Sequence, residues 1–352
     1  MRQPVVERVR SLVGERARAL AGPWPDLRLA VAVEQGSARW AGSWRDRAWS
    51  DDDGPRYLIY SVTKPVIALL VLRLAARGAV ELDAPLARWL PEAPHADRVT
   101  VRQLLLHTSG MPDYGPLREY HEAVRRTPAI PWPDSEFLAR AVPGPLDFAP
   151  GAGWDYSNVG YLLLRRLLER VHGDPFAAIF AREVAAPLAL RHSRVAAELD
   201  DLLPLAPGYS RYVGGEGGPA VDVRGRYHPR WVAHGVVAST APELARLLHA
   251  LLTGELLPPP LQAALTDAVR VPEHHPRFAE PSYALGLMVD PAARRGPTLG
   301  HTGGGPGYGA GAFHARPATG APPVTAVALA NADLGDAMEA LSLEMLDVLA
   351  AG

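Results

Sequence analysis

The chain of 352 residues contains no cysteine, which excludes disulfides, thiolate zinc sites and cysteine nucleophiles. It also lacks a charge bias. With 36 basic and 38 acidic residues, it offers no electrostatic argument for nucleic acid or an anionic membrane as a partner. The longest uncharged apolar run, residues 65–72, is far too short to span a bilayer. The N-terminus carries charges every few residues and no apolar core of a secretory signal, which predicts a cytoplasmic protein.

Lysine is almost absent. Lys64 is the only lysine, and the other 35 basic residues are arginine, which cannot lose its proton in a protein. Lys64 stands three residues after Ser61, where a short apolar run meets a long apolar segment. Residues three apart share one face of a helix, so the two side chains are expected side by side on the first turn of a helix over 61–77.

This spacing favours catalysis over the plainer alternative of a capping serine and a solvated lysine. A serine hydroxyl is a poor nucleophile until a base takes its proton. Lysine can be that base where burial or a neighbouring cation lowers its pKa. A chain that uses arginine everywhere else keeps its single lysine where a removable proton would matter.

The periodicity of apolar residues predicts strands near both ends of the chain and helices between them. With 48% hydrophobic residues a sizeable core is available. We predict an α+β fold (an α/β sandwich): an antiparallel sheet, flanked by N- and C-terminal helices, plus an inserted all-helical domain. The sheet-containing domain is assigned to 1–65 and 234–352, and the mainly helical domain to 66–233. Strands are expected at 27–34, 38–44, 283–290, 297–300, 310–315 and 324–330, helices at 2–21, 158–172 and 337–349, and a surface excursion at 203–233.

The segment Tyr156-Ser157-Asn158 lies at an expected loop-to-helix boundary. Tyr156 could share a proton with Lys64, or it could itself be the base as a phenolate, because a nearby cation lowers the pKa of a phenol. Asn158 could hydrogen-bond Lys64 and an amide of the substrate. Taken alone, the tripeptide is more typical of a helix cap followed by core than of a catalytic site.

The glycine-rich segment 300–307 contains His301, Thr302, Gly303 and Gly304. Glycines let a substrate lie close to a strand, and the backbone N–H of Gly304 could form an oxyanion hole with that of Ser61. A phosphate loop is disfavoured because no Gly-Lys-Ser/Thr follows. A plain glycine-rich turn remains an alternative.

Two histidine-containing segments are interpreted as non-catalytic. His107, at an expected helix C-terminus, is interpreted as scaffold that is favourably placed for the helix dipole. His274 and His275, beside Glu273, lack a zinc-type spacing and are assigned to a surface loop. No metal site and no cofactor are therefore expected.

The motif order resembles the serine β-lactamase and penicillin-binding protein superfamily. The closest likeness is to the class C β-lactamase and D-alanyl-D-alanine carboxypeptidase branch, which also includes esterases, D-aminopeptidases and acyltransferases. The likeness covers about residues 28–331 and rests on three motifs: Ser61-Val62-Thr63-Lys64, Tyr156-Ser157-Asn158 and His301-Thr302-Gly303.

This resemblance implies an acyl-enzyme on Ser61, with Lys64 and Tyr156 sharing the acid–base work. It also implies that Asn158, His301, Thr302 and Gly303 contact the substrate, and that Ser61 and Gly304 supply the oxyanion N–H groups. His301 replaces the lysine with which the third motif often begins. Since histidine titrates near neutrality, a fixed cation for a substrate carboxylate is less assured.

The expected function is a serine hydrolase of small esters or amides. The absence of an export signal argues against cell-wall peptides and β-lactams, whose enzymes act outside the cytoplasm. An acyltransferase of specialised metabolism that uses the same acyl-enzyme is the first alternative. A non-catalytic sensor that resembles penicillin-binding proteins is the second.

Overall fold

A computed structural model describes residues 1, 3–51, 54–213, 215, 218–317 and 320–350. Its helices are α1 (Gln3–Leu20), α2 (Lys64–Ala76), α3 (Val101–Leu106), α4 (Arg118–Arg126), α5 (Asp134–Ala141), α6 (Asn158–His172), α7 (Phe176–Phe180), α8 (Ala241–Leu252), α9 (Pro259–Thr266) and α10 (Gly335–Ala350). Its strands are β1 (Arg28–Gln35), β2 (Ala38–Arg45), β3 (Ala48–Ser50), β4 (Tyr57–Leu58), β5 (Arg194–Ala196), β6 (Tyr209–Ser210), β7 (Val221–Asp222), β8 (Val236–Ser239), β9 (Val269–Arg270), β10 (Ser282–Ala284), β11 (Leu287–Asp290), β12 (Thr298–Gly305), β13 (Tyr308–Ala315) and β14 (Val324–Ala330).

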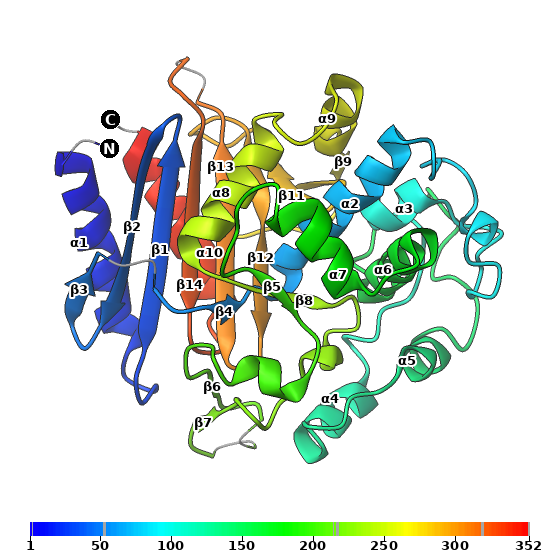
Figure 1. Cartoon of the computed structure of the whole chain (residues 1–352), viewed down its shortest axis with the longest axis horizontal. Helices are drawn as coiled ribbons and strands as arrows, with labels where there is room; N and C mark the ends of the chain where they lie inside the picture. Colours follow the sequence, from blue (N-terminus) through cyan, green and yellow to red (C-terminus); the bar gives the residue numbers. More distant parts are fainter. Residues whose placement is uncertain (2, 52–53, 214, 216–217, 318–319, 351–352) are drawn as a thin grey trace.

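The largest sheet has nine strands in the order β3-β2-β1-β14-β13-β12-β11-β10-β9. Every neighbouring pair in it is antiparallel. The interior of this sheet joins segments from the two ends of the chain, because β1 pairs with β14 along seven residue pairs. Both chain termini accordingly lie at the same side of the molecule (Figure 1). The structure confirms the predicted α+β class with its antiparallel sheet and flanking terminal helices.

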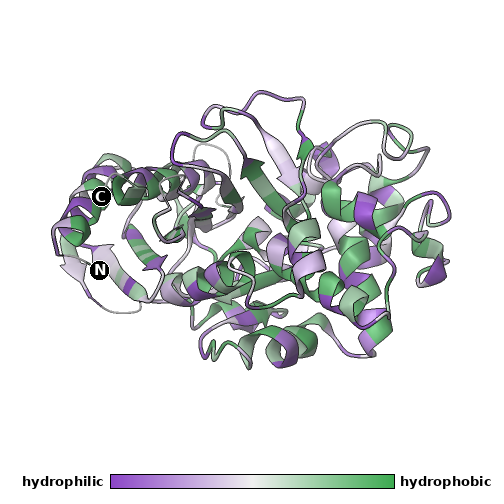
Figure 2. Ribbon diagram, turned by 90° about the horizontal axis from the view of Figure 1, so that it is seen from above, coloured by the Kyte–Doolittle hydropathy of each residue, from purple (hydrophilic) through white to green (hydrophobic). Residues whose placement is uncertain are grey.

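The two faces of the sheet are covered by different helices. Along β1, Leu29, Val31 and Val33 belong to a core with α1 and α10, whereas Ala30 and Ala32 belong to the core on the opposite face, which α8 covers. This alternation follows from the two-residue period of a strand. The terminal helices show bands of both hydropathy colours, as expected of helices that bury one face (Figure 2).

Helix α10 lies unusually close to the sheet at β13. A Cβ atom added to Gly311 would lie 2.2 Å from the carbonyl oxygen of Met338. Only glycine fits at such a backbone approach. This tight contact fixes the start of α10 beside β12, next to the candidate active site.

Helices α2 to α7 form the second part of the molecule, at the right of Figure 1. Almost every residue of α2 is buried, including Lys64, so this helix runs through the core instead of along the surface. The division into a sheet-containing and an inserted helical domain remains a proposal. None of the described helices is both long enough and apolar enough to cross a membrane.

Several elements differ from the expectation. The single strand expected at 283–290 is a hairpin of two strands, β10 and β11, because Gly286 adopts a positive φ of 77°. The strand expected to end at Gly300 continues to Gly305, so the glycine-rich motif is itself strand.

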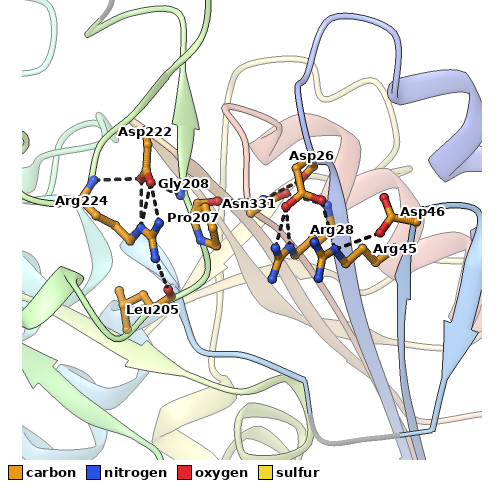
Figure 3. A network of polar contacts seen from close by, with 10 residues as sticks. All are labelled: Asp26, Arg28, Arg45, Asp46, Leu205, Pro207, Gly208, Asp222, Arg224 and Asn331. Carbon is orange, nitrogen blue, oxygen red and sulfur yellow. Dashed lines mark hydrogen bonds and ion pairs between the residues drawn. The ribbon is translucent and has the colours of Figure 1, made fainter.

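The excursion at 203–233, of which residues 214, 216 and 217 lie outside the described part, is not confined to the surface. Tyr227 and Trp231 are fully buried. The amide of Asn331 anchors this segment to the sheet: its Nδ2 donates to the carbonyls of Asp26 (2.9 Å) and Pro207 (2.7 Å), and its Oδ1 accepts from the N–H of Arg28 (Figure 3). Nearby, Asp222 pairs with Arg224 and holds the N–H of Gly208.

Candidate active site

Ser61 lies on a sharp turn between β4 and α2. Tyr60 has a φ of 46°, which is uncommon for a residue with a side chain, and the chain then forms a short 3₁₀ helix over Tyr60–Thr63. The turn is held by β8, because Val237 accepts from the N–H of Ile59 (2.9 Å) and donates to the Thr63 hydroxyl (3.0 Å). The predicted α-helix therefore starts at Lys64 and not at Ser61. Side chains three apart eclipse in a 3₁₀ turn, so Ser61 and Lys64 still meet.

The Lys64 ammonium group is completely buried. Its Nζ donates to Ser61 Oγ at 3.1 Å and to Asn158 Oδ1 at 2.8 Å, and it lies 4.6 Å from the centre of the Tyr156 ring. Burial lowers the pKa of Lys64 from 10.5 to about 7, although the negative charge of Asp113 opposes the shift. At this pKa a substantial fraction of Lys64 is neutral at physiological pH and able to accept a proton from Ser61.

Asp113 fixes the orientation of Asn158 and is a site residue that the sequence analysis missed. Its carboxylate accepts from the backbone N–H of Asn158 (2.8 Å) and from Asn158 Nδ2 (3.0 Å). With Nδ2 held in this way, the amide oxygen must face Lys64. The sequence analysis assigned no role to Asp113, and the residue that it contacts lies 45 positions away in the chain.

Tyr156 lies in the loop before α6, with its ring against that of His107 at 4.4 Å between centroids. Burial raises the pKa of the Tyr156 phenol far above its ordinary value, and the neighbouring Ser61 hydroxyl offsets this only partly. Tyr156 is therefore a neutral phenol near pH 7. The structure places it in the same cluster as Ser61, Lys64 and Asn158.

The His107 ring packs against the Tyr156 ring. It caps α3 with a φ of 61°, and its Nδ1 accepts from the N–H of Ser157 at 3.1 Å. Burial lowers the pKa of His107 well below 6.5, so it is neutral. The expectation of a favourable helix-dipole interaction is therefore wrong, because that interaction needs a charged imidazole. Within the described part of the chain, no hydrogen bond joins His107 to Ser61.

Strand β12 passes close to the turn that carries Ser61. A Cβ added to Gly303 would lie 2.2 Å from the Ile59 carbonyl oxygen and 3.2 Å from the Ser61 nitrogen. Among the described residues, β11 pairs with β12 only as far as Gly300, whereas β13 pairs with β12 as far as Gly305. The stretch from His301 to Gly304 therefore forms an edge beside Ser61, where a substrate could lie.

His301 is buried in this edge and uncharged. Its Nδ1 lies 2.5 Å from the Thr302 carbonyl oxygen, which can only accept, so this nitrogen carries the proton and Nε2 accepts from the Tyr283 hydroxyl at 3.1 Å. Burial, with a further contribution from Lys64, lowers the pKa of His301 to about 3. The expectation that His301 titrates near neutrality is wrong, and this position supplies no cation.

Two cavities meet at Gly304. The first, here called the tyrosine-side pocket, has a volume of about 410 Å³, and its lining includes Ser61, Trp154, Tyr156, Phe278, Tyr283 and Met288. The second, here called the helix-side pocket, has a volume of about 590 Å³, and its lining includes Tyr120, His121, Tyr212, Pro306, Asp333 and Asp336.

The segment with Glu273, His274 and His275 is a surface loop, as predicted, and Glu273 and His274 are exposed. It also lines the tyrosine-side pocket. Sequence spacing gave no sign of this, because the pocket is closed by strands from elsewhere in the chain. Within the described part of the chain, no group of three or more histidine, cysteine or acidic side chains is placed to hold a metal ion.

Comparison with protein families gives one assignment for nearly the whole chain. The family model described as Beta-lactamase matches residues 28–350. Esterase EstB of Burkholderia gladioli is 43% identical over 147 residues, which are 38% of this chain and 37% of that protein. Penicillin-binding protein 4* of Bacillus subtilis is 26% identical over 260 residues, 70% of this chain and 55% of that protein. The matches thus span less than two thirds of either relative's own length.

Among solved structures, a D-stereospecific amidohydrolase from Streptomyces sp. superposes with a TM-score of 0.79. It is 28% identical, and the superposition covers 95% of this chain and 98% of that one. The antiparallel sheet and the helical part thus occur together in a protein of similar size.

Proposed function

The chain belongs to the β-lactamase family, and on that premise we propose that it is a serine hydrolase of small esters or amides that works through an acyl-Ser61 intermediate. The observation that carries the proposal is the contact between Lys64 Nζ and Ser61 Oγ at 3.1 Å, with the lysine buried and its pKa lowered to about 7. A nucleophile and a matched base within hydrogen-bond reach are the signature of covalent catalysis. The names of the esterase and the amidohydrolase among its relatives agree with this reaction class.

Acylation begins when neutral Lys64 accepts the proton of Ser61 Oγ. The serine oxygen then bonds to the substrate carbonyl carbon, and the carbonyl oxygen becomes an oxyanion. The backbone N–H groups of Ser61 and Gly304 are proposed to receive that charge, which in such sites is often the largest single catalytic contribution. Gly303 allows this arrangement, because any side chain there would collide with the Ile59 carbonyl.

Lys64, and not Tyr156, is proposed as the base. Burial raises the pKa of Tyr156 so far that the phenolate is scarcely populated near neutral pH. The pKa of Lys64, about 7, lies in that range, so a substantial fraction of the lysine is neutral there. Tyr156 is instead proposed to give its proton to the leaving oxygen or nitrogen as the bond of that atom to the acyl carbon breaks, and to receive from Lys64 the proton that came from Ser61. In the second half, water attacks the acyl carbon as neutral Lys64 accepts its proton, and this proton passes to Ser61 Oγ as the acyl–serine bond breaks, which releases the acid and restores Ser61.

Asn158, His301, Thr302 and Gly303 are proposed to position the substrate along the edge of β12. The amide nitrogen of Asn158 donates to Asp113, and its oxygen accepts from Lys64. Its first proposed role is therefore to orient Lys64, and its second is to contact the substrate. His301 is uncharged and is held by its hydrogen bond to Tyr283. It is proposed to limit the space for the substrate and not to attract it by a positive charge.

The proposal is tested by Ser61→Ala, with Ser11→Ala on the exposed face of α1 as the matched control. We expect Ser61→Ala to lose hydrolysis of p-nitrophenyl butyrate at least a thousandfold while circular dichroism stays unchanged, and Ser11→Ala to retain it. Ester or amide turnover by a folded Ser61→Ala protein would refute the acyl-Ser61 mechanism.

Acyl transfer is the second candidate, and it uses the same intermediate with an amine or alcohol in place of water. Adding such acceptors during turnover separates the two, because a transferase yields condensed product in excess of hydrolysis. A silent sensor is the third, and it would be supported if Ser61 took up no acyl group from any ester or penicillin.

A further inference from the structure

We propose that the tyrosine-side pocket receives the leaving group, and that it selects uncharged, apolar alcohols or amines over leaving groups that carry a carboxylate. This inference rests on the proposed serine hydrolase function and adds the substrate class to it. Three features of the described site carry the argument: which groups line each pocket, how apolar the walls are, and where the charges lie.

The position of the proton donor decides which half of the substrate enters which pocket. The acyl carbon must lie between Ser61 Oγ and the N–H of Gly304, and the leaving atom must face the group that protonates it. Ser61 and Tyr156 both line the tyrosine-side pocket, whereas neither lines the helix-side pocket. The leaving group therefore extends into the tyrosine-side pocket, and the acyl chain extends past Gly304 toward Pro306.

The walls of the tyrosine-side pocket are aromatic and apolar. Trp154 and Tyr283 lie with ring centroids 5.8 Å apart, and Phe278 and Met288 line the same space. Aromatic walls of this kind bind an aryl or alkyl group through apolar contact, and a cavity of about 410 Å³ is large enough for one. A small hydrophilic leaving group would leave most of this surface unfilled.

The charges around the pocket disfavour an anion. His301, which lines the pocket, has both ring nitrogens engaged by Tyr283 and Thr302. None of the described residues that line the pocket is lysine or arginine, and the exposed carboxylate of Glu273 lies at its edge. An anionic leaving group would lose its hydration and meet a like charge, and both effects are unfavourable.

The first experiment compares two matched esters, 4-(methoxycarbonyl)phenyl butyrate and 4-carboxyphenyl butyrate, at pH 8, with each kcat/KM divided by its rate of alkaline hydrolysis. We expect the neutral ester to be preferred at least tenfold. Glu273→Lys should reduce that preference by roughly fivefold, because it reverses one charge near the pocket. Glu280→Lys, on the same exposed loop but outside the pocket lining, should leave the preference unchanged.

The second experiment separates acylation from deacylation by rapid mixing of 1-naphthyl butyrate with wild type and Met288→Ala. The leaving group has departed before deacylation, so truncation of its pocket should slow acylation by roughly tenfold and leave the deacylation rate constant unchanged. Deacylation that slows while acylation is unchanged would place the acyl group in this pocket and overturn the assignment.

The remaining outcomes are also decisive. Equal values of kcat/KM, each divided by the rate of alkaline hydrolysis, for the neutral and anionic esters would overturn the proposed selectivity. An equal change of the preference in Glu273→Lys and Glu280→Lys would overturn it as well. Failure of the underlying function looks different, because then Ser61→Ala would hydrolyse both esters as fast as wild type.

Discussion

Because Lys64 is buried, we predict that the free energy of unfolding depends on pH through this residue. Lys64 has a pKa of about 7 in the folded protein and an ordinary value of 10.5, so between these values the unfolded chain binds one more proton than the folded one. Raising the pH through this window therefore stabilises the fold. At pH 6, where Lys64 is charged in both states, its burial costs the folded state about 4–5 kcal/mol. At pH 9 the remaining cost is about 2 kcal/mol.

Lys64→Met removes this ionisable group and keeps most of its volume. Relative to Lys64→Met, the free energy of unfolding of wild type should thus increase by about 3 kcal/mol from pH 6 to pH 9. Urea titrations of both proteins at both pH values measure it, and titrating groups that do not interact with Lys64 cancel in the comparison. A constant difference between the two proteins at pH 6 and pH 9 would refute a lowered lysine pKa, and with it the role of Lys64 as a neutral base.

Three further predictions concern catalysis. The kcat/KM of wild type should fall about tenfold per pH unit below pH ~7 and stay level from pH 8 to 10, as pH–rate profiles measure; a rise that continues to pH 10 would point to a Tyr156 phenolate as base. Asp113→Asn should reduce kcat/KM by roughly 10–100-fold and move the acidic limb of the pH–rate profile to lower pH, because the negative charge of Asp113 raises the pKa of Lys64 in wild type. An acidic limb at the same pH in both proteins would show that Lys64 does not sense this charge. Gly303→Ala should lose activity at least a hundredfold, because its Cβ would lie 2.2 Å from the Ile59 carbonyl oxygen, whereas Gly144→Ala, with open space around it, should retain activity in the same assay.

The sheet and its flanking helices could be predicted because their signals are local. Short apolar runs mark β1 and β14, and their pairing brings the two ends of the chain together. The motif order and the single lysine pointed to one residue cluster, and the structure places Ser61, Lys64, Tyr156 and Asn158 together.

The parts that could not be predicted depend on contacts between distant segments. Asp113 reaches Asn158 only after α3 and α6 pack together, and the loop at 273–275 lines a pocket only because β10, β11 and β12 form its other walls. The protonation state of His301 follows from burial and from Tyr283, neither of which is visible in a one-dimensional pattern. Sequence motifs therefore pointed to the groups that we propose to react, whereas their protonation states and the lining of the pockets required the fold.

The central claim is that Ser61 carries the acyl group, and its most direct test is mass spectrometry of the intact protein and of its peptides after brief mixing with p-nitrophenyl butyrate. Wild type should gain one butyryl group on the peptide that contains Ser61, with release of nitrophenol, and Ser61→Ala should gain none. A butyryl group on a different residue, or equal nitrophenol release by both proteins without any adduct, would contradict the account.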